Sequence, residues 1–442
     1  MQKLTGTLSQ LSGAKVAVIG DLILDTYTIG KARRISPEAP VAVLEVEKED
    51  FKAGGAGNVA LNLKSLGAKV TLVGRLGNES SSQMLKKSLS EEGISTNALF
   101  IEKNYQTPVK NRVIADNQQI VRIDHEKIFH LSKELEEEII AKLPLLCQGV
   151  EAIAISDYGK GFLSIKLLRA ISELAHQEDI PIIADPKGID FTKYLGVTVL
   201  KPNTSEAYLA ANLPKEAPLQ DVAKKLLEIT QAKALMITRS EAGISCFYKD
   251  KPQEDFPVQM KEVKDVTGAG DTVLAMLAIA LASQLKISEA AQFCNLAAGI
   301  AIERFGCARV SLSDLARRLL ELDYHNKVFD EEHLFALQEA VKDRKITLLG
   351  ISGKNGLTTA IFNTIKEMTC GGHFDLIVYV RDVEPNEALV NVLASMQNVN
   401  FIILNTDSLR NLCSQIKPDE VYLLEEETLT KLEEAEKLLE SV

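Results

Sequence analysis

Short apolar runs alternate with helical patterns over the first 240 residues, and this alternation constrains the fold more than any other feature of the sequence. Strands that alternate with helices form a parallel sheet with helices on both faces. Ligands of such sheets bind at the carboxyl ends of the strands, where Asp21 and Asp25 follow the first run. The runs rich in β-branched residues are KVAVIG (15–20), AIAIS (152–156), PIIAD (181–185), VTVLKPN (197–203) and ALMIT (234–238).

Two segments interrupt this rhythm, at about 41–51 and 107–124. In both segments apolar and polar residues alternate, which is typical of antiparallel strands with one wetted face. We expect a small sheet that projects from the main domain and acts as a lid or as a dimer surface.

Past residue 322 the strand and helix pattern starts again, with the runs ITLLG, LIVYV, FIILN and VYLL separated by helical segments. A chain of 442 residues is long enough for two or three domains. We therefore predict two domains, 1–325 and 326–442, of which the second is large enough to fold alone.

The composition, with 46% hydrophobic and 25% charged residues, is that of an ordinary globular protein. A net charge of −11 argues against a nucleic-acid or an anionic membrane partner. The first residues, MQKLTGTLSQ, lack the apolar core of a secretory signal, and the six cysteines form no CxxC pair. These features predict a cytoplasmic protein with reduced thiols.

The stretch VKDVTGAGDTVLAML (263–277) places three small residues before an apolar helix that we expect to start near Asp271. The first N–H groups of a helix have no partner within the helix, and small side chains let an anion approach them. The pocket suits a phosphoryl group, with Asp271 placed to accept a proton from an attacking hydroxyl. The alternative is a helix cap after a glycine turn.

A second pair of glycines, Gly54 and Gly55, precedes another predicted helix in AGGAGNVALNLKSLGA (53–68). The pair permits close backbone approach to a polyhydroxylated ligand, and Asn58 and Asp25 offer hydrogen-bonding groups to its hydroxyls. Taken alone, the stretch also fits an ordinary tight turn before an amphipathic helix.

Two further polar turns follow predicted strands. In LKPNTSEA (200–207), Asn203 and Glu206 would share a face of a first helical turn and could hold Mg²⁺, directly or through water. The same spacing fits an asparagine cap with a stabilising glutamate. In TRSEAG (238–243), Thr238 and Gly243 could lie along a nucleotide.

These four motifs, in this order, resemble the ribokinase-like (PfkB) family of carbohydrate kinases. That family has a Gly-Gly substrate motif, an N-x-x-E magnesium motif, a nucleotide turn and a late D-T-x-G-A-G-D signature, which reads DVTGAGD here with Val266 in place of threonine. The likeness covers about residues 10–320. It implies an α/β fold: a three-layer αβα domain with a small β-sheet lid, followed by a second, smaller Rossmann-like domain.

The resemblance also implies roles for single residues and for cofactors. Asp271 would be the base, in an ATP- and Mg²⁺-dependent phosphoryl transfer. The family's lid often doubles as a dimer interface, which implies a homodimer. The remaining roles would be an anion hole from Gly268, Ala269 and Gly270, a sugar site from Asp25, Gly54, Gly55 and Asn58, a magnesium site from Asn203 and Glu206, and an ATP site that also includes Thr238, Gly243 and Asn295.

A narrower likeness comes from the strings RISPEAP (34–40), NQQIVRIDHE and ISDYGKG. These strings are similar to those of the heptose 7-phosphate kinases of lipopolysaccharide-core biosynthesis. The implied reaction phosphorylates the anomeric hydroxyl of D-glycero-D-manno-heptose 7-phosphate. A sugar phosphate needs local cations in an acidic chain, and we favour Arg112 and Lys187 from a set that also contains Arg33, Arg34, Lys110 and Arg122.

Heptose kinases are often fused to a nucleotidyltransferase with an H-x-G-H motif. The corresponding stretch here, KITLLGISGKNGLTTAIFNTIKEM, has no histidine, so we expect no adenylyltransferase activity. Rival interpretations are a kinase of another sugar or sugar phosphate, a non-catalytic sugar-phosphate sensor, and a main activity in the C-terminal half. Asp271, Asn203 and Glu206 count against the sensor, because a sensor does not need all three.

Overall fold

The computed structural model describes residues 2–116, 118–258, 263–304, 306–322, 327–329, 333–354, 356–369, 374–382, 384–404, 417–435 and 437–440. The chain forms two compact units, one of Leu11–Ser311 and one of Leu312–Val442 together with Met1–Gln10. The domain boundary predicted between residues 325 and 326 lies outside the described residues.

A nine-stranded sheet forms the centre of the unit Leu11–Ser311, in the order β13-β12-β11-β10-β9-β8-β1-β4-β5. The strands from β11 to β5 run parallel, whereas β12 and β13 are antiparallel additions at one edge. The strand bounds are β1 Lys15–Gly20, β4 Lys69–Leu76, β5 Leu99–Ile101, β8 Ala152–Ser156, β9 Ile182–Asp185, β10 Val199–Leu200, β11 Ala234–Thr238, β12 Ile244–Tyr248 and β13 Glu254–Phe256.

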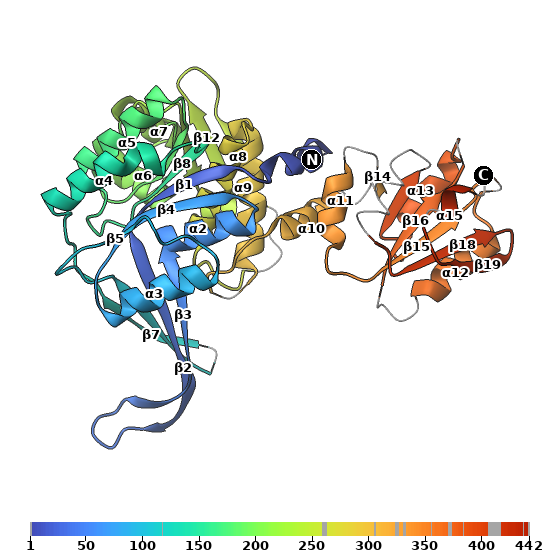
Figure 1. Ribbon diagram of the computed structural model, residues 1–442, viewed down its shortest axis with the longest axis horizontal. Coiled ribbons are helices and arrows are strands. Elements are labelled where there is room, and N and C mark those ends of the chain that lie inside the picture. Colours follow the sequence, from blue (N-terminus) through green and yellow to red (C-terminus); the bar gives the residue numbers. More distant parts are fainter. Residues whose placement is uncertain are drawn as a thin grey trace. The chain divides into compact units, whose positions relative to one another are not determined.

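Helices cover both faces of this sheet and complete three layers (Figure 1). One face packs against α4 (Lys133–Leu146), α5 (Ile165–Gln177), α6 (Thr204–Ala211) and α7 (Leu219–Thr230) through a large apolar cluster. The other face carries α2 (Ala56–Ser65), α8 (Ala269–Ala282) and α9 (Ile287–Ile302). Helix α8 is apolar on every side because it is buried between the sheet and α9. The other helices of this unit are α3 Ser80–Glu91 and the short 3-10 helices η2 Phe191–Tyr194 and η3 Ser240–Ala242.

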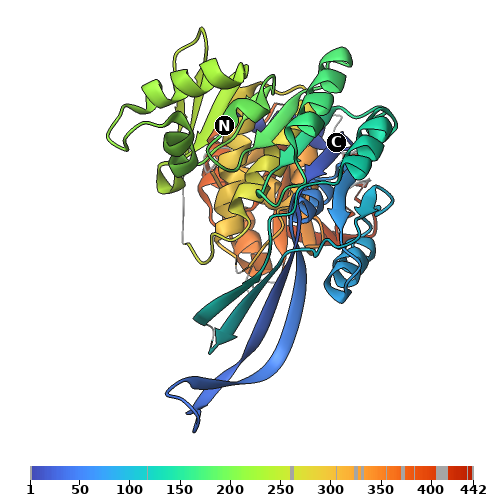
Figure 2. The ribbon, with the colours of Figure 1, turned by 90° about the vertical axis from the view of Figure 1, so that its left-hand side faces the viewer.

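A separate four-stranded sheet, in the order β3-β2-β6-β7, projects from this unit (Figure 2). It contains β2 Leu22–Ile35, β3 Ala42–Gly55, β6 Val109–Ala115 and β7 Gln118–His125. Both segments predicted to form the lid lie in it. The predicted segment 107–124 is a hairpin of two strands, and β2 was not predicted.

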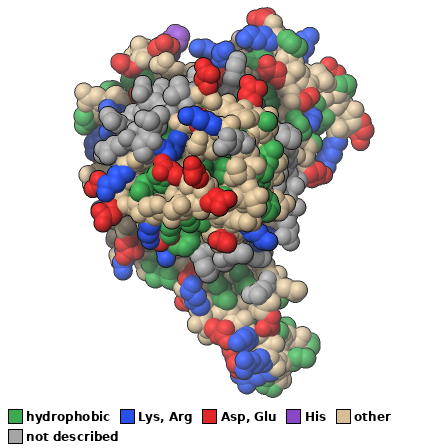
Figure 3. Space-filling view, turned by 90° about the vertical axis from the view of Figure 1, so that its right-hand side faces the viewer, with side chains coloured by type: hydrophobic (Ala, Val, Ile, Leu, Met, Phe, Trp, Pro, Cys, Tyr) green, Lys and Arg blue, Asp and Glu red, His purple; other side chains and the backbone are tan. Residues whose placement is uncertain are grey.

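The outer half of the β2–β3 hairpin extends beyond β6, which pairs with β2 only from Leu24 to Gly30. Charged side chains of both signs gather on this arm, at the bottom of Figure 3, with hydrophobic side chains beside them. The ion pair Lys31–Glu47 lies on it, whereas Lys48–Asp50 lies where β6 still pairs with β2.

The second unit contains a six-stranded sheet in the order β14-β17-β16-β15-β18-β19, in which β19 alone runs antiparallel to its neighbour. Its inner strands coincide with the four predicted runs. Two apolar clusters lie on its two faces. The strand bounds are β14 Val328–Phe329, β15 Ile346–Ile351, β16 Asp375–Val380, β17 Phe401–Leu404, β18 Glu420–Glu425 and β19 Thr428–Leu432. The helices are α1 Gln2–Thr7, α10 Leu312–Leu322, α11 Leu334–Val341, α12 Thr359–Thr369, α13 Glu387–Ser395 and α15 Lys437–Glu440. A short 3-10 helix, η1 Leu8–Leu11, follows α1.

Across the described residues, none of the helices combines the length and the apolar character needed to cross a membrane. Cys147, Cys246, Cys294 and Cys307 are free and buried. The other two cysteines, Cys370 and Cys413, lie outside the described residues.

Candidate active site

The small residues of the DVTGAGD stretch form the start of α8. Gly268 caps the helix with φ of 79°, a conformation that favours glycine, and the helix begins at Ala269, two residues before the predicted start. The N–H of Ala269 donates to the carbonyl of Val266 at 3.2 Å. The N–H groups of Gly268, Gly270 and Asp271 donate to no other described residue. Of the residues predicted to form an anion hole, Gly268 and Gly270 thus have amides without a partner among the described residues, whereas the amide of Ala269 is engaged.

Asp271 lies in the first turn of α8 with only 3% of its surface exposed. Its two carboxylate oxygens accept hydrogen bonds from Asn58 Nδ2 at 2.8 Å and from the Tyr158 hydroxyl at 2.7 Å. Burial raises the pKa of Asp271 to about 7, and these two hydrogen bonds oppose the rise because they stabilise the ionised form. A carboxyl group that titrates near neutral pH is suited to proton transfer.

The Gly-Gly pair brings Asn58 to this carboxylate. Gly54 and Gly55 end strand β3, and α2 begins at the next residue. A Cβ on Gly54 would lie 2.1 Å from Asp25 Oδ2, so only glycine permits this approach. Gly55 has φ of 57°, and its own Cβ would meet the carbonyl of Asp21 at 2.5 Å. The two glycines thus place the start of α2 beside Asp21, which follows β1, and Asp25 of β2.

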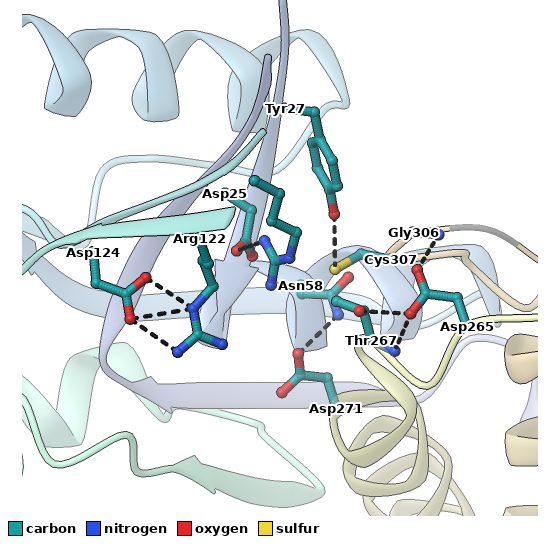
Figure 4. Close-up of polar contacts among 11 residues, drawn as sticks. Asp25, Tyr27, Asn58, Arg122, Asp124, Asp265, Thr267, Asp271, Gly306 and Cys307 are labelled. Atoms are coloured by element: carbon teal, nitrogen blue, oxygen red, sulfur yellow. Dashed lines mark hydrogen bonds and ion pairs between the residues drawn. The ribbon is translucent and has the colours of Figure 1, made fainter. Parts of the chain in front are cut away.

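Asp25 lies on the lid strand β2 and is 6% exposed. Its carboxylate forms an ion pair with Arg112 of β6 at 2.5 Å, and the Arg112 guanidinium lies 5.4 Å from the ring centre of Tyr27. Figure 4 shows the Asn58–Asp271 contact together with Asp25 and Tyr27 of the lid. The four residues predicted to bind a sugar, Asp25, Gly54, Gly55 and Asn58, therefore lie next to the candidate base.

The predicted nucleotide residues gather around a pocket of about 510 Å³ that also borders Ala269 and Gly270. Gly243 has φ of 84°, and a Cβ there would lie 2.1 Å from the carbonyl of Phe256. The same carbonyl accepts a hydrogen bond from Asn295 Nδ2 at 2.6 Å. All five predicted residues border this pocket: Asn203, Glu206, Thr238, Gly243 and Asn295.

Asn203 and Glu206 form a capping box at the start of α6. Asn203 Oδ1 accepts from the Glu206 N–H at 2.9 Å, and Glu206 Oε2 accepts from the Asn203 N–H at 3.1 Å. Glu206 Oε1 also pairs with Lys187 Nζ at 2.7 Å. The capping alternative left open by the sequence is thus the observed geometry, and it holds the glutamate at the pocket wall.

Lys187 lies beside one of the predicted nucleotide residues. Its ammonium pairs with Glu206, and the residue borders the same pocket. It had been favoured, with Arg112, as a ligand of the sugar's phosphate. Arg112 does lie on the lid, but its charge is already paired with Asp25.

Three residues that the sequence did not single out complete the site. Tyr158 holds Asp271, while Asp185 at the end of β9 pairs with the buried Lys201 at 2.9 Å. Burial raises the pKa of Asp185 to about 6, and the Lys201 ammonium opposes the rise. A Cβ on Gly270 would lie 3.9 Å from both charged groups, so the pair faces the start of α8. Their signal was present, because Asp185 ends the predicted run 181–185, Lys201 lies in the run 197–203, and Tyr158 follows the run 152–156.

Asp21, which directly follows β1, has a structural role. Its carboxylate accepts hydrogen bonds from the backbone N–H groups of Tyr158 at 2.9 Å, Lys160 at 3.1 Å and Phe162 at 3.4 Å. Burial is the largest cause of a raised pKa at Asp21, which these bonds oppose. Asp21 thereby fixes the loop that presents Tyr158 to Asp271.

Within the described part of the chain, no group of three or more His, Cys, Asp or Glu side chains is placed to hold a metal ion. The oxygen-bearing side chains of Asp185, Asn203 and Glu206 border the pocket. This donor set fits Mg²⁺, which usually takes one or two carboxylates and completes its shell with water and phosphate.

Comparison with known proteins identifies the family. The profile of the pfkB family carbohydrate kinases matches residues 14–315, which is more than half of the chain. The chain belongs to the pfkB family of carbohydrate kinases. The prediction of a sugar kinase is therefore confirmed for a segment that contains all of the site residues described above.

The pfkB chain has close curated relatives. It is 41% identical to the bifunctional protein HldE of Trichlorobacter lovleyi over 341 residues, which cover 76% of this chain and 70% of the relative. It is 32% identical to the bifunctional protein HldE of Syntrophotalea carbinolica over 441 residues, covering 93% of this chain and 88% of the relative. The second likeness extends into the C-terminal unit.

Solved structures confirm the predicted ribokinase-like fold. The ribokinase of Arabidopsis thaliana, solved with ribose and ATP, matches with a TM-score of 0.54 at 17% identity and covers 70% of this chain and 99% of that one. Phosphofructokinase-2 of Escherichia coli matches with a TM-score of 0.59 at 18% identity, with the same coverage. At these identities the likeness is one of fold.

Proposed function

We propose that this chain transfers the γ-phosphoryl group of ATP to the anomeric hydroxyl of D-glycero-D-manno-heptose 7-phosphate, giving the 1,7-bisphosphate of ADP-heptose and lipopolysaccharide-core biosynthesis. The observation that carries the proposal is the setting of Asp271, which is buried, has a pKa of about 7 and lies in the first turn of α8 beside open amides. The choice of a heptose rests on the strings shared with heptose kinases and on the similarity to the HldE proteins.

Asp271 would accept the proton of the attacking hydroxyl, because its carboxylate lies in the first turn of α8 beside Asn58, one of the predicted sugar residues. Asn58 and Tyr158 would hold the carboxylate in position for this transfer. The amides of Gly268, Gly270 and Asp271 would stabilise the negative charge that develops on the transferred phosphoryl group. The lid would exclude water, which otherwise competes with the sugar as acceptor.

ATP would occupy the pocket of about 510 Å³ bordered by Thr238, Gly243 and Asn295. Mg²⁺, when bound, supplies positive charge that neutralises the phosphate oxygens. Asn203 and Glu206 would hold it through water, since their side chains already cap α6. Lys187 would add a further positive charge on the same side.

For the C-terminal unit we propose no adenylyl transfer. The turn after β15 has no histidine, and its Ser352 hydroxyl donates to Asp382 at 2.9 Å. The imidazoles that would contact a triphosphate in the H-x-G-H motif have no counterpart in this turn. Formation of ADP-heptose from heptose 1-phosphate and ATP by the purified chain would contradict the proposal.

We also propose that two copies of the chain associate through the lid sheet. Register places Phe51, Val121 and Ile123 on the lid face opposite to Asp25, and they are 41%, 47% and 43% exposed. An exposed apolar face of this kind is typical of a protein interface. Light scattering should give twice the chain mass, and a monomer at micromolar concentration would contradict the dimer.

The reaction is tested by ³¹P NMR of the protein with Mg-ATP and D-glycero-D-manno-heptose 7-phosphate, with fructose 6-phosphate and ribose in parallel. We expect a new anomeric phosphate signal with the heptose alone. Turnover with another acceptor only would replace the heptose by that sugar and keep the kinase. Tight binding without turnover of any acceptor would instead favour a sugar-phosphate sensor.

A further inference from the structure

The lid face that carries Asp25 also carries a group of basic side chains. In the register of the lid sheet, Lys110 of β6 lies between Asp25 of β2 and Asp124 of β7. One rung further along, Arg112 lies opposite Arg122. Residues that face each other across neighbouring strands point to the same side of a sheet. Lys110, Arg112 and Arg122 therefore share the face of the lid that is turned toward the candidate sugar site.

Most of these cations already have a carboxylate partner. Arg112 pairs with Asp25 at 2.5 Å, and Arg122 binds Asp124 through its Nε at 2.9 Å. Lys160, which follows Tyr158 by two residues, pairs with Glu126 at 2.7 Å and is 12% exposed. Lys110 is the remaining cation of this group.

Lys110 forms no ion pair with any residue in the described part of the chain. Its ammonium lies 5.4 Å from the ring centre of Tyr158, whose hydroxyl donates to Asp271. Burial lowers the pKa of Lys110, and the positive charges of Lys160 and Arg122 lower it further, against Glu126 and Asp25. A half-buried ammonium beside two other cations costs free energy until an anion neutralises it.

We infer that Lys110, supported by Lys160 and Arg122, binds the phosphate at the far end of the acceptor sugar, and so selects phosphorylated over unphosphorylated acceptors. Figure 4 shows Arg122 and Asp25 of the lid in one view with Asp271 of α8. One tyrosine ring separates the Lys110 ammonium from the hydroxyl that contacts the base. A sugar phosphate whose anomeric oxygen meets Asp271 would then extend along Tyr158 toward Lys110.

This inference deepens the proposed function and rests on it for the orientation of the acceptor. It also replaces the two cations favoured from the sequence. Arg112 and Lys187 are each held by a carboxylate, as are the supporting cations Arg122 and Lys160, whereas Lys110 has no ion-pair partner among the described residues. The subsite therefore belongs to the lid and to the Tyr158 loop, so phosphate binding would couple lid position to the base.

Calorimetric titration tests the subsite without requiring turnover. The wild-type chain is titrated with D-glycero-D-manno-heptose 7-phosphate, with fructose 6-phosphate and with unphosphorylated heptose, and so are Lys110→Met, Lys110→Arg and the lid control Lys31→Gln. We expect Lys110→Met to weaken binding of the phosphorylated ligand about 30-fold, the size of a lost hydrogen bond to a charged group, and to leave the unphosphorylated heptose within about 3-fold. Lys110→Arg should restore most of the affinity.

Two results would overturn the subsite: wild-type protein that binds phosphorylated and unphosphorylated heptose equally, or Lys110→Met that weakens both by the same factor. If Lys110→Met does not fold, the exposed Arg122→Gln must show the same selective loss, about 5-fold for a more exposed pair. Selective binding of the sugar phosphate without phosphoryl transfer would retain the subsite and remove the proposed kinase reaction, so the two failures are distinguishable.

Discussion

Replacing Tyr158 with phenylalanine tests the assignment of Asp271 through its acidity. The substitution removes one hydroxyl, which donates to Asp271 Oδ1 at 2.7 Å, and leaves the ring in place beside Lys110. The hydrogen bond stabilises ionised Asp271 more than it stabilises the protonated form. Without it, burial raises the pKa of Asp271 further above the present value of about 7.

The size of the effect follows from the strength of such bonds. A hydrogen bond to a charged group contributes about 1.5–3 kcal/mol, and part of it survives when the carboxyl is protonated. A net difference of about 1.4 kcal/mol raises the pKa by about one pH unit. At pH 7 the ionised fraction would fall from about one half to about one tenth, so the rate falls about 5-fold.

The assay is kcat/KM for the sugar acceptor from pH 5.5 to 9.5, which reports the pKa of the base in the free enzyme. Wild-type activity should rise with pH through a midpoint near 7. The Tyr158→Phe profile should have its midpoint about one unit higher and should meet the wild-type profile at high pH. Tyr422→Phe, which removes a hydroxyl from the C-terminal unit, serves as the control.

Two profiles would refute this reasoning. One is a Tyr158→Phe midpoint that coincides with that of wild type, which would mean that the hydroxyl does not control the base. The other is an equal deficit at every pH, which would indicate that the tyrosine only positions substrate.

Three further substitutions test the candidate site and a buried ion pair of the main domain. Gly268→Ala should lower Tm and activity more than Gly13→Ala, because both have positive φ but only the first would place its Cβ against Asn58, at 2.9 Å; equal losses would mean that backbone strain alone matters. Arg75→Met should reduce the free energy of unfolding in urea by about 3–5 kcal/mol, since it leaves Glu102 buried without its partner at 2.6 Å, and a loss below about 1 kcal/mol would contradict this. Glu206→Gln should raise the Mg²⁺ concentration needed for half-maximal rate about 10-fold, and an unchanged requirement would remove Glu206 from the metal site.

Several strands of the main domain could be predicted, because buried strands are short runs of apolar, β-branched residues and the flanking helices are amphipathic. The runs 15–20, 152–156 and 234–238 coincide with β1, β8 and β11. Strand β2 was missed because it follows β1 after a single residue, Asp21, without a turn signal. The second lid segment was predicted as one unit, although a hairpin divides it into β6 and β7.

The glycine motifs indicated the candidate site because a larger residue is strained by the positive φ of Gly55 and Gly268 and would contact Asp25 at Gly54. The sequence could not predict which side chains bind Asp271, because these contacts depend on proximity in the folded chain. Tyr158 reaches Asp271 across 113 positions of sequence, and Asn58 reaches it across 213. The same limit applies to Lys187, whose ion pair with Glu206 the sequence did not indicate.

The central claim is that Asp271 is the base of a sugar kinase, and Asp271→Asn tests it most directly. Asparagine keeps the size and can still accept from Asn58, while its amide can donate to the Tyr158 hydroxyl, but it cannot accept the proton. The measurement is the rate of phosphoryl transfer from Mg-ATP to heptose 7-phosphate, followed by ³¹P NMR, together with Tm and ATP affinity. The account predicts a loss of about 1,000-fold or more in kcat with Tm and ATP affinity retained, whereas a rate within about 10-fold of wild type would contradict it.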